Sequence, residues 1–256
     1  MSGILEAFRL DGKVAVVTGA ERGLGRGMAV ALAQAGAHIV GVTYVASAPE
    51  TEAAVQAAGR KYVHVMADLS SIEPVQRIVD TAVAQFGRID ILLNNAGTIM
   101  RNDTIDFTEQ QWDAVMNVNL KTAFFLCQAV ARRFMEQGSG GKIINIASML
   151  SFQGGIRVPS YTASKSGIRG LTMLMANEWA SRGICVNAIA PGYMATDNTA
   201  QLRADAQRSA DILARIPAAR WGTPEDLQGA VVFLASSASD YVNGTTLAVD
   251  GGWLAR

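Results

Sequence analysis

Seven short runs rich in β-branched residues recur along the chain, separated by longer amphipathic stretches, and this alternation constrains the fold more than any other feature. The runs are continuous rather than alternating in character, as expected of strands that are buried on both faces. Strands that alternate with helices form a parallel sheet covered by helices on both faces. We therefore predict one α/β domain over residues 1–256, with a doubly wound, seven-stranded parallel sheet. The predicted strands are Val14–Thr18, His38–Val42, Tyr62–Met66, Ile89–Leu93, Lys142–Ile146, Ile184–Ile189 and Thr246–Val249.

Several helix starts can be recognised between the predicted strands. Ser70–Glu73 and Thr108–Gln111 have the pattern of capping boxes, and Pro224 after Thr223 is typical of a first helical position. The segment 195–219 follows a strand but is polar and helical in pattern. Ligands of such sheets bind at the carboxyl ends of the strands, so we predict that this segment is a lid over a substrate site. The alternative is a solvated helical excursion.

The composition excludes several classes of protein. Hydrophobic residues make up 50% of the chain and charged residues 17%, and 22 basic side chains balance 22 acidic ones. A chain this apolar is not disordered, and a zero net charge argues against nucleic-acid and membrane-surface partners. The chain has only two cysteines, Cys127 and Cys185, and two histidines, His38 and His64. No metal site is expected from so few ligands.

The same residues bear on the cellular compartment. Two separate cysteines in apolar settings form no disulfide framework, which is typical of a reducing compartment. Met1–Leu10 lacks the pattern of a signal peptide, and the most apolar segment, Met28–Val42, is too short and too interrupted to span a bilayer. We therefore expect a cytoplasmic protein.

A glycine-rich turn follows the first predicted strand. Residues 18–25 read Thr-Gly-Ala-Glu-Arg-Gly-Leu-Gly and lead into a helical run. Glycines permit a tight turn and a close approach of the backbone to a pyrophosphate, to which the helix N-terminus then offers N–H groups. An ordinary tight turn would also use glycine, but the position after the first strand favours a Rossmann-type dinucleotide site. The residues of this site are Gly19, Arg22, Gly23, Leu24 and Gly25.

The end of the second predicted strand bears on the choice of cofactor. An acid there binds the ribose 2′-hydroxyl and disfavours a 2′-phosphate. This strand ends instead in Thr43 and Tyr44, which are uncharged. Arg22 is either the cation that meets a 2′-phosphate or a solvated loop residue. We predict that Thr43 borders the cofactor, that NAD(H) is preferred, and that NADP(H) is used measurably.

Ser148, Tyr161 and Lys165 form a second constellation. Ser148 ends the fifth predicted strand, whereas Tyr161 and Lys165 lie one turn apart on a predicted helix and share a face. A tyrosine with a pKa of about 10 needs ~4 kcal/mol of phenolate stabilisation to ionise near pH 7, and we expect the Lys165 ammonium and an oxidised nicotinamide to supply it. Tyr161 then exchanges a proton with a substrate oxygen held by Ser148. A Tyr–Lys pair on an ordinary helix face is the alternative.

These motifs, in this order, resemble the short-chain dehydrogenase/reductase family over Leu10–Arg256. The resemblance rests on the glycine loop, on Asn94–Gly97, on the Ser148, Tyr161 and Lys165 group, and on Pro191-Gly192 followed by Thr196. It implies that Asn119 joins the catalytic residues by holding a water that links Lys165 to solvent. It also implies further cofactor-binding residues, namely Asp68, Leu69, Asn95, Ala96, Gly97, Tyr161, Lys165, Pro191, Gly192 and Thr196.

Two stretches, residues 143–167 and 235–256, more closely resemble members of this family that act on keto-deoxy sugar acids in uronate and pectin breakdown. The resemblance implies hydride transfer between NAD(H) and 2-keto-3-deoxygluconate, its 2,5-diketo form or 2-deoxygluconate. It also implies a homotetramer, with the apolar tail Gly251–Ala255 at a subunit interface. A tail folded onto its own subunit is the alternative.

A sugar acid requires a cation for its carboxylate and donors for its hydroxyls. Gln153 and Arg157 follow Ser148, and Arg101 follows the fourth predicted strand. We predict that these residues and Ser148 bind substrate, and we favour Arg157 over Arg101 because it lies close to Tyr161 in the sequence. A 3-oxoacyl thioester reductase or a polyol dehydrogenase on the same scaffold is an alternative. A non-catalytic dinucleotide sensor is another, disfavoured because all four catalytic residues are present.

Overall fold

The computed structural model describes residues 3–256 and contains one sheet of seven parallel strands in the order β3-β2-β1-β4-β5-β6-β7. The winding direction changes between β1 and β4, both of which are hydrogen-bonded neighbours in the sheet centre. The predicted doubly wound parallel sheet is confirmed. The strands are β1 (Val14–Thr18), β2 (His38–Thr43), β3 (Tyr62–Met66), β4 (Ile91–Asn94), β5 (Gly141–Ile146), β6 (Ile184–Pro191) and β7 (Thr246–Val249).

One strand begins later than predicted. β4 starts at Ile91 rather than Ile89. The Gln137 side chain accounts for the difference, since its Oε1 accepts from the Ile89 N–H at 2.9 Å and its Nε2 donates to the Ile89 carbonyl at 2.8 Å. The backbone of Ile89 is therefore bonded to a helix end rather than to a neighbouring strand.

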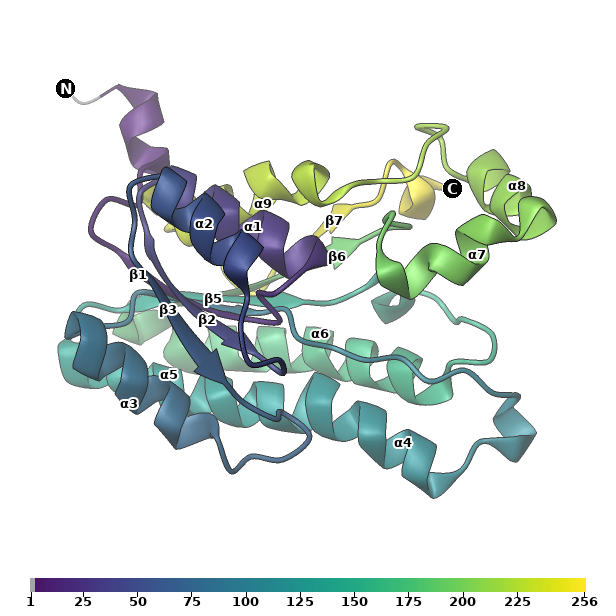
Figure 1. Ribbon diagram of the computed structural model, residues 1–256, viewed down its shortest axis with the longest axis horizontal. Helices are drawn as coiled ribbons and strands as arrows, with labels where there is room; N and C mark the ends of the chain where they lie inside the picture. The colour runs from purple at the N-terminus through teal and green to yellow at the C-terminus, as the bar shows by residue number, and fades with distance from the viewer. Residues whose placement is uncertain (1–2) are drawn as a thin grey trace.

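Helices cover both faces of the sheet (Figure 1). Ala15 and Val17 of β1 point to one face and Val14 and Val16 to the other, so the alternate side chains of a single strand serve two separate cores. On the first face pack α1 (Gly23–Gln34), α2 (Pro49–Ala57) and α9 (Gln228–Ala235), and on the second α3 (Val75–Phe86), α5 (Ala123–Gln137) and α6 (Pro159–Trp179).

Two of the three predicted helix starts are confirmed. Thr108 and Gln111 form a reciprocal capping box at the start of α4 (Glu109–Met116), and Pro224 opens a 3-10 turn capped by Thr223. The predicted capping box at Ser70–Glu73 is wrong. α3 begins only at Val75, after Pro74, and the Ser71 hydroxyl makes a local turn with the Glu73 N–H.

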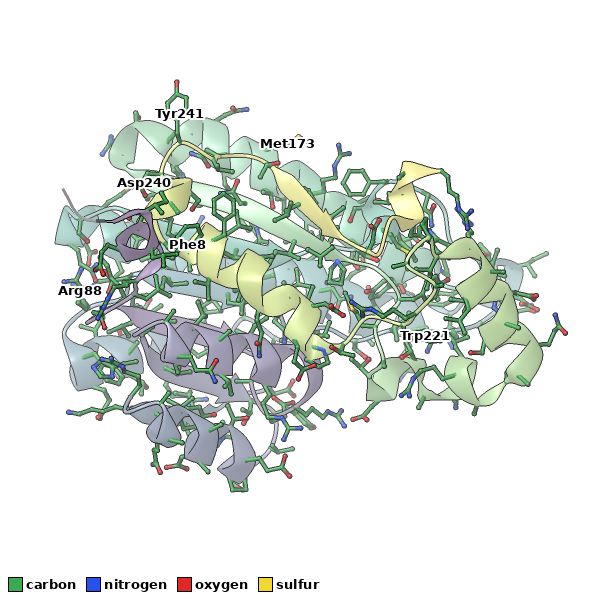
Figure 2. All side chains as sticks on the ribbon, turned by 90° about the horizontal axis from the view of Figure 1, so that it is seen from above. Phe8, Arg88, Met173, Trp221, Asp240 and Tyr241 are labelled. Atoms are coloured by element: carbon green, nitrogen blue, oxygen red, sulfur yellow. The ribbon has the colours of Figure 1, made fainter. Side chains whose placement is uncertain are left out.

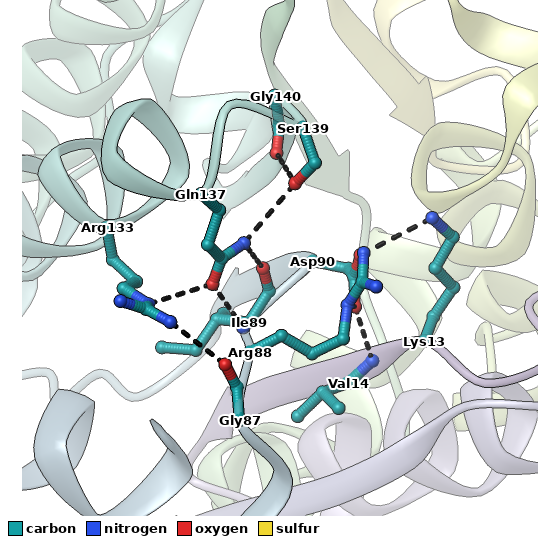
Figure 3. Close-up of polar contacts among 10 residues, drawn as sticks. All are labelled: Lys13, Val14, Gly87, Arg88, Ile89, Asp90, Arg133, Gln137, Ser139 and Gly140. Atoms are coloured by element: carbon teal, nitrogen blue, oxygen red, sulfur yellow. Dashed lines mark hydrogen bonds and ion pairs between the residues drawn. The ribbon is translucent and has the colours of Figure 1, made fainter.

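The amino ends of β1 and β4 are held by a buried carboxylate (Figure 3). Asp90 is 5% exposed, and its Oδ2 accepts from the Val14 N–H at 3.0 Å. Lys13 and Arg88 complete its ionic partners, with the Arg88 Nε at 2.9 Å. This network stabilises the sheet at the amino ends of its strands. The carboxyl ends of the strands stay open for ligands.

Segment 195–219 is helical, as predicted. It contains α7 (Ala200–Ala204) and α8 (Ala206–Arg215), which project beyond the sheet at the right of Figure 1. Seen from above, Trp221 lies at this end of the molecule and Phe8 and Arg88 lie at the other (Figure 2).

The C-terminal tail packs against its own chain at Trp253. Trp253 is 4% exposed and packs in its own chain with Ile212, Ile216 and Met149. The Arg215 guanidinium lies 4.0 Å from the Trp253 ring centroid. Segment 195–219 of the same chain thus covers Trp253, as the alternative of a tail folded onto its own subunit expects, and contact of the rest of the tail with a partner subunit stays a prediction.

One helical run among the described residues, Glu109–Gln137, is long and apolar enough to cross a membrane by length and composition. It comprises α4, a π-helical turn at Asn117–Thr122, and α5. The apolar face of α5, including Leu126, Val130 and Phe134, packs in the core beneath the sheet. Core helices of globular proteins pass the same test, so the run is a weak indication of a membrane span.

Candidate active site

A cavity of about 600 Å³ opens at the carboxyl ends of the strands, on both sides of the point where the winding direction changes. Open α/β sheets bind their ligands at this place. Most of the predicted cofactor-binding residues line the cavity. They are Gly19, Arg22, Gly23, Leu24, Gly25, Thr43, Asp68, Leu69, Asn95, Ala96, Gly97, Tyr161, Lys165 and Thr196.

The glycine loop is fixed by side-chain contacts to its backbone. Asn95, which follows β4, donates from Nδ2 to the carbonyls of Thr18 at 2.9 Å and Gly19 at 3.2 Å. The Thr18 hydroxyl in turn accepts from the N–H groups of Asn95 and Ala96. A Cβ on Gly25 would lie 1.9 Å from the Gly19 carbonyl oxygen, so only glycine permits this turn.

The shape of the loop fits a bound pyrophosphate. Gly23 begins α1 with a φ of 53°, and a Cβ there would meet only the Thr196 methyl group, 3.9 Å away. The first turn of α1 lines the cavity, where a helix N-terminus favours an anion. The residues present therefore fit a dinucleotide, and the loop would hold its phosphates.

Two predicted cofactor residues lie elsewhere. Pro191 is buried in the sheet opposite Val249, and Gly192 lines a separate cavity of about 120 Å³ beside Asp250. Among the described residues of this part of the chain, Thr196 and Asp197 line the main cavity. Assignment of Pro191 and Gly192 to direct cofactor contact is not supported by this geometry.

At the carboxyl end of β2, which the sequence places beside the adenosine ribose, the Thr43 side chain is hydrogen-bonded to other residues of the protein. Thr43 is 2% exposed, and its hydroxyl donates to the Val45 carbonyl at 2.7 Å and lies 2.6 Å from His64 Nε2. Tyr44, also lining the cavity, is 69% exposed. Neither residue brings a charge to this end of the cavity.

The three catalytic candidates converge as predicted. Tyr161 and Lys165 of α6 both line the cavity, and the Lys165 Nζ lies 5.7 Å from the Tyr161 ring centroid. Ser148, at the end of β5, is hydrogen-bonded to Tyr161 through its side chain. Lys165 is 4% exposed and donates to the Ile146 carbonyl at 2.6 Å. This group can hold a substrate oxygen and exchange a proton with it.

The pKa of Tyr161 differs from expectation. Burial raises it above its usual value, while the hydrogen bond with Ser148 and the charge of Arg101 act in the opposite direction. Burial also lowers the pKa of Lys165 to about 8. Lys165 alone does not lower the Tyr161 pKa here, because the ammonium is itself desolvated and is directed at the Ile146 carbonyl. The further contribution expected of an oxidised nicotinamide stays a prediction.

Asn119 lies in the π-helical turn between α4 and α5 and is 2% exposed. Its Oδ1 accepts from the Thr98 N–H at 2.8 Å, and its Nδ2 donates to the Thr98 carbonyl and to the Ser164 hydroxyl. Asn119 thereby joins the loop after β4 to α6, the helix that carries Tyr161 and Lys165. The extra residue of a π-turn directs the amide out of the regular helical repeat.

The predicted substrate residues are arranged differently from expectation. Arg157 has a φ of 63°, and its Nε pairs with Asp103 at 2.9 Å. Gln153 accepts a hydrogen bond from Arg215 of α8 at 3.2 Å. Arg101 is the arginine close enough to Tyr161 for its charge to lower the pKa of that residue. The preference for Arg157 over Arg101 as a substrate-binding residue stays a prediction, and the geometry favours Arg101.

Sequence reasoning missed several residues that line the cavity. Thr98, Met100, Ala114 and Val118 come from the loop after β4 and from the helix that follows it. They carry no motif, and only the bend of the chain brings them to the site. Glu21 and Asp197 add two acids to the lining. Asp197 was discoverable as the acid next to Thr196 in the predicted lid.

Comparison with known proteins places these motifs in a family. The family model described as enoyl-(acyl carrier protein) reductase matches residues 19–254. A 2-dehydro-3-deoxy-D-gluconate 5-dehydrogenase of Escherichia coli (strain K12) is 66% identical over 253 residues, which are 99% of this chain and 100% of that protein.

Two solved structures extend the likeness to the fold. A candidate 2-deoxy-D-gluconate 3-dehydrogenase from Agrobacterium tumefaciens, solved with bound NADP, is 52% identical with a TM-score of 0.90, covering 98% of this chain and 99% of that one. A gluconate 5-dehydrogenase from Burkholderia cenocepacia J2315, in complex with NADP and tartrate, is 41% identical with a TM-score of 0.94, covering 99% and 100%. By sequence motifs, fold and full-length similarity, the chain belongs to the short-chain dehydrogenase/reductase family of oxidoreductases.

Proposed function

We propose that this chain transfers a hydride between NAD(P)(H) and a keto-deoxy sugar acid such as 2-keto-3-deoxygluconate, its 2,5-diketo form or 2-deoxygluconate. The observation that carries the proposal is the position of Tyr161, which lines a cavity fitted to a dinucleotide, is hydrogen-bonded to Ser148, and lies near the charge of Arg101. The names of the E. coli and A. tumefaciens relatives support the substrate class.

When bound, a nicotinamide dinucleotide supplies or accepts the hydride. In the reductive direction, the Tyr161 hydroxyl donates its proton to the substrate carbonyl oxygen, and the Ser148 hydroxyl donates a hydrogen bond to the same oxygen. With a pKa of about 8, Lys165 is mostly protonated at neutral pH and stabilises the phenolate that Tyr161 becomes. Lys165 would also hold the nicotinamide ribose, and Asn119 would hold a water through which the proton is replaced. The oxidative direction reverses these transfers.

Arg101 is the residue proposed to hold the substrate carboxylate, because its charge already acts on Tyr161. Gln153 and Arg157 lie in the neighbouring loop and are proposed to contribute hydrogen bonds to the substrate hydroxyls. Segment 195–219 is proposed as the lid. The contact from Arg215 of α8 to Gln153 supports this role, since it joins the segment to the substrate loop.

We further propose that the enzyme is a cytoplasmic homotetramer, with a small sugar acid as its partner and neither nucleic acid nor a membrane. The balanced charge of the chain supports these exclusions. Light scattering at micromolar concentration tests the assembly, and a monomeric mass would contradict it.

The activity is tested with NADH and NADPH against a panel of keto-deoxy sugar acids, neutral polyols and 3-oxoacyl thioesters. We expect the highest kcat/KM with a keto-deoxy sugar acid. The thioester arm tests the alternative that the description of the matching family model raises. Faster turnover of a thioester or a polyol would replace the proposed substrate class, and no turnover of any carbonyl would favour a dinucleotide sensor.

A further inference from the structure

An ion pair joins the glycine loop to the start of segment 195–219. The Arg22 Nη1 lies 3.1 Å from the Asp197 Oδ2. Arg22 is the N-cap of α1, and Asp197 opens the 3-10 turn that leads into α7. Both residues line the cavity assigned to the cofactor, so the pair bridges its mouth from the phosphate-binding turn to the proposed lid.

The pair is poised to exchange partners. The side chains of Arg22 and Asp197 are 68% and 77% exposed, and an ion pair at such exposure is worth little in water. A phosphate dianion offers a guanidinium a stronger, bidentate partner than a single carboxylate oxygen does. Arg22 can therefore leave Asp197 when a phosphate comes within reach.

The charges around the cavity make Arg22 decisive for a 2′-phosphate. Among the described residues that line the cavity, the cations are Arg22 and Lys165, and the acids are Glu21, Asp68 and Asp197. Lys165 is bonded to the Ile146 carbonyl at the catalytic end. Thr43 and Tyr44 add no charge at the other end, so a 2′-phosphate has Arg22 as its available cation and Asp197 as the competitor for it.

We propose that Asp197 is a specificity-determining residue for the cofactor. By pairing with Arg22, it withholds a cation that NADP(H) needs and NAD(H) does not, and so limits the use of NADP(H). The inference rests on the proposed function and deepens it. Cofactor choice then depends on two residues from distant parts of the chain, and a 2′-phosphate that takes Arg22 also frees the first turn of segment 195–219.

The test measures binding of 2′,5′-ADP and 5′-ADP by calorimetry, which needs neither nicotinamide nor turnover. In Asp197→Asn, we expect the affinity for 2′,5′-ADP to rise about threefold to fivefold, the range expected on breaking an exposed ion pair, and the affinity for 5′-ADP to stay within about twofold. Arg22→Ala should lower the 2′,5′-ADP affinity about tenfold. In the Arg22→Ala background, Asp197→Asn should have no further effect.

Asp211→Asn is the matched control. Asp211 lies in α8 of the same segment and accepts a hydrogen bond from Gln207, so this change removes the same charge without touching Arg22. An equal gain in Asp211→Asn, a gain in Asp197→Asn that persists with Arg22→Ala, or no change in Asp197→Asn would each overturn the inference. Failure of the wild type to bind 5′-ADP would instead overturn the proposed function.

A second readout tests the link to the lid. Hydrogen exchange of residues 197–204 in the wild type should be faster with saturating 2′,5′-ADP than with saturating 5′-ADP, because only the former takes Arg22 from Asp197. In Asp197→Asn, the two ligands should give the same exchange. Equal exchange with both ligands in the wild type would contradict the proposal that Asp197 is released.

Discussion

The cofactor cavity and the neighbouring loops proposed to bind substrate, called here the cofactor half and the substrate half of the site, are held together by different kinds of contact. At the cofactor half, side chains bond to backbone, as where the Asn95 amide donates to the Thr18 and Gly19 carbonyls. At the substrate half, charged side chains on separate loops bond to each other, as Arg157 does with Asp103. Backbone contacts dictate the residue type at each position, whereas an arginine on a loop needs only some acid within reach. The comparison indicates a cofactor half intolerant of substitution and a substrate half that is tolerant except where it touches the reacting atoms.

Tyr161 lies where the two halves meet, and its substitution should have the largest effect. Tyr161→Phe removes the proton donor and keeps the ring, so turnover should fall roughly 10²–10⁴-fold. The change should not affect cofactor binding, and calorimetry with 5′-ADP should give the wild-type affinity. Turnover near that of the wild type would refute the role of Tyr161, and a parallel loss of 5′-ADP binding would refute the separation of the two halves.

Alanine substitution of two glycines, one from each half, should have the next largest effect and tests how well each half tolerates substitution. In Gly25→Ala the new Cβ would lie 1.9 Å from the Gly19 carbonyl oxygen and 2.4 Å from Asn95 Nδ2. Relief requires a backbone shift, so the free energy of unfolding should fall by about 3 kcal/mol and 5′-ADP binding should weaken. In Gly154→Ala the Cβ would meet nothing within 4 Å, and both quantities should be unchanged. Denaturant unfolding and calorimetry measure them, and similar values for the two variants would break the comparison.

The difference between backbone contacts and pairings of loop side chains also explains which features the sequence could predict. The strands were predicted to within two residues, since each run of β-branched and apolar residues corresponds to one strand of the sheet. Gly19, Gly25 and Asn95 were assigned correctly to the cavity because the turn permits few other residues. The Ser70–Glu73 capping box failed because its pattern is local, whereas the helix begins at Val75, after Pro74, four residues later than a cap at Ser70 would place it.

Loop pairings could not be predicted in the same way. Nothing in the sequence says that Arg157 faces Asp103 while Arg101 acts on Tyr161, because these residues meet only after two loops fold against each other. The burial of Trp253 against segment 195–219 is likewise a property of tertiary packing. The raised pKa of Tyr161 follows from burial, which a spacing of residues does not reveal.

The two arginines of the substrate half provide the third test. Arg101→Met should raise the KM for a sugar acid tenfold to a hundredfold, the value of a charge-assisted hydrogen bond of about 1.5–3 kcal/mol. Arg157→Met should change it only about twofold to fivefold, because Arg157 is already paired with Asp103 and acts through the position of its loop. Steady-state kinetics with a neutral polyol is the control, since it has no carboxylate. A larger effect from Arg157→Met would restore Arg157 as the carboxylate-binding residue.

The smallest effect should be one of stability at Lys165, and it should be opposite in sign to the effect on activity. Burial lowers the pKa of Lys165 from 10.5 to about 8, so the folded protein binds this proton more weakly than the unfolded chain does. Between these two pH values the unfolded chain keeps a proton that the folded protein has lost, so the free energy of unfolding rises with pH. Below pH 8 both states are protonated, and the full cost of burying the charge applies. That cost is on the order of 3 kcal/mol, from which the hydrogen bond to the Ile146 carbonyl recovers about 1–2 kcal/mol.

Lys165→Met should therefore be about 1–2 kcal/mol more stable than the wild type at pH 7, with an advantage that disappears toward pH 10, while its turnover and cofactor binding are lost. Urea unfolding from pH 6 to pH 10 measures the difference, and a variant less stable than the wild type at pH 7 would mean that the ammonium is better solvated or better bonded than its burial indicates.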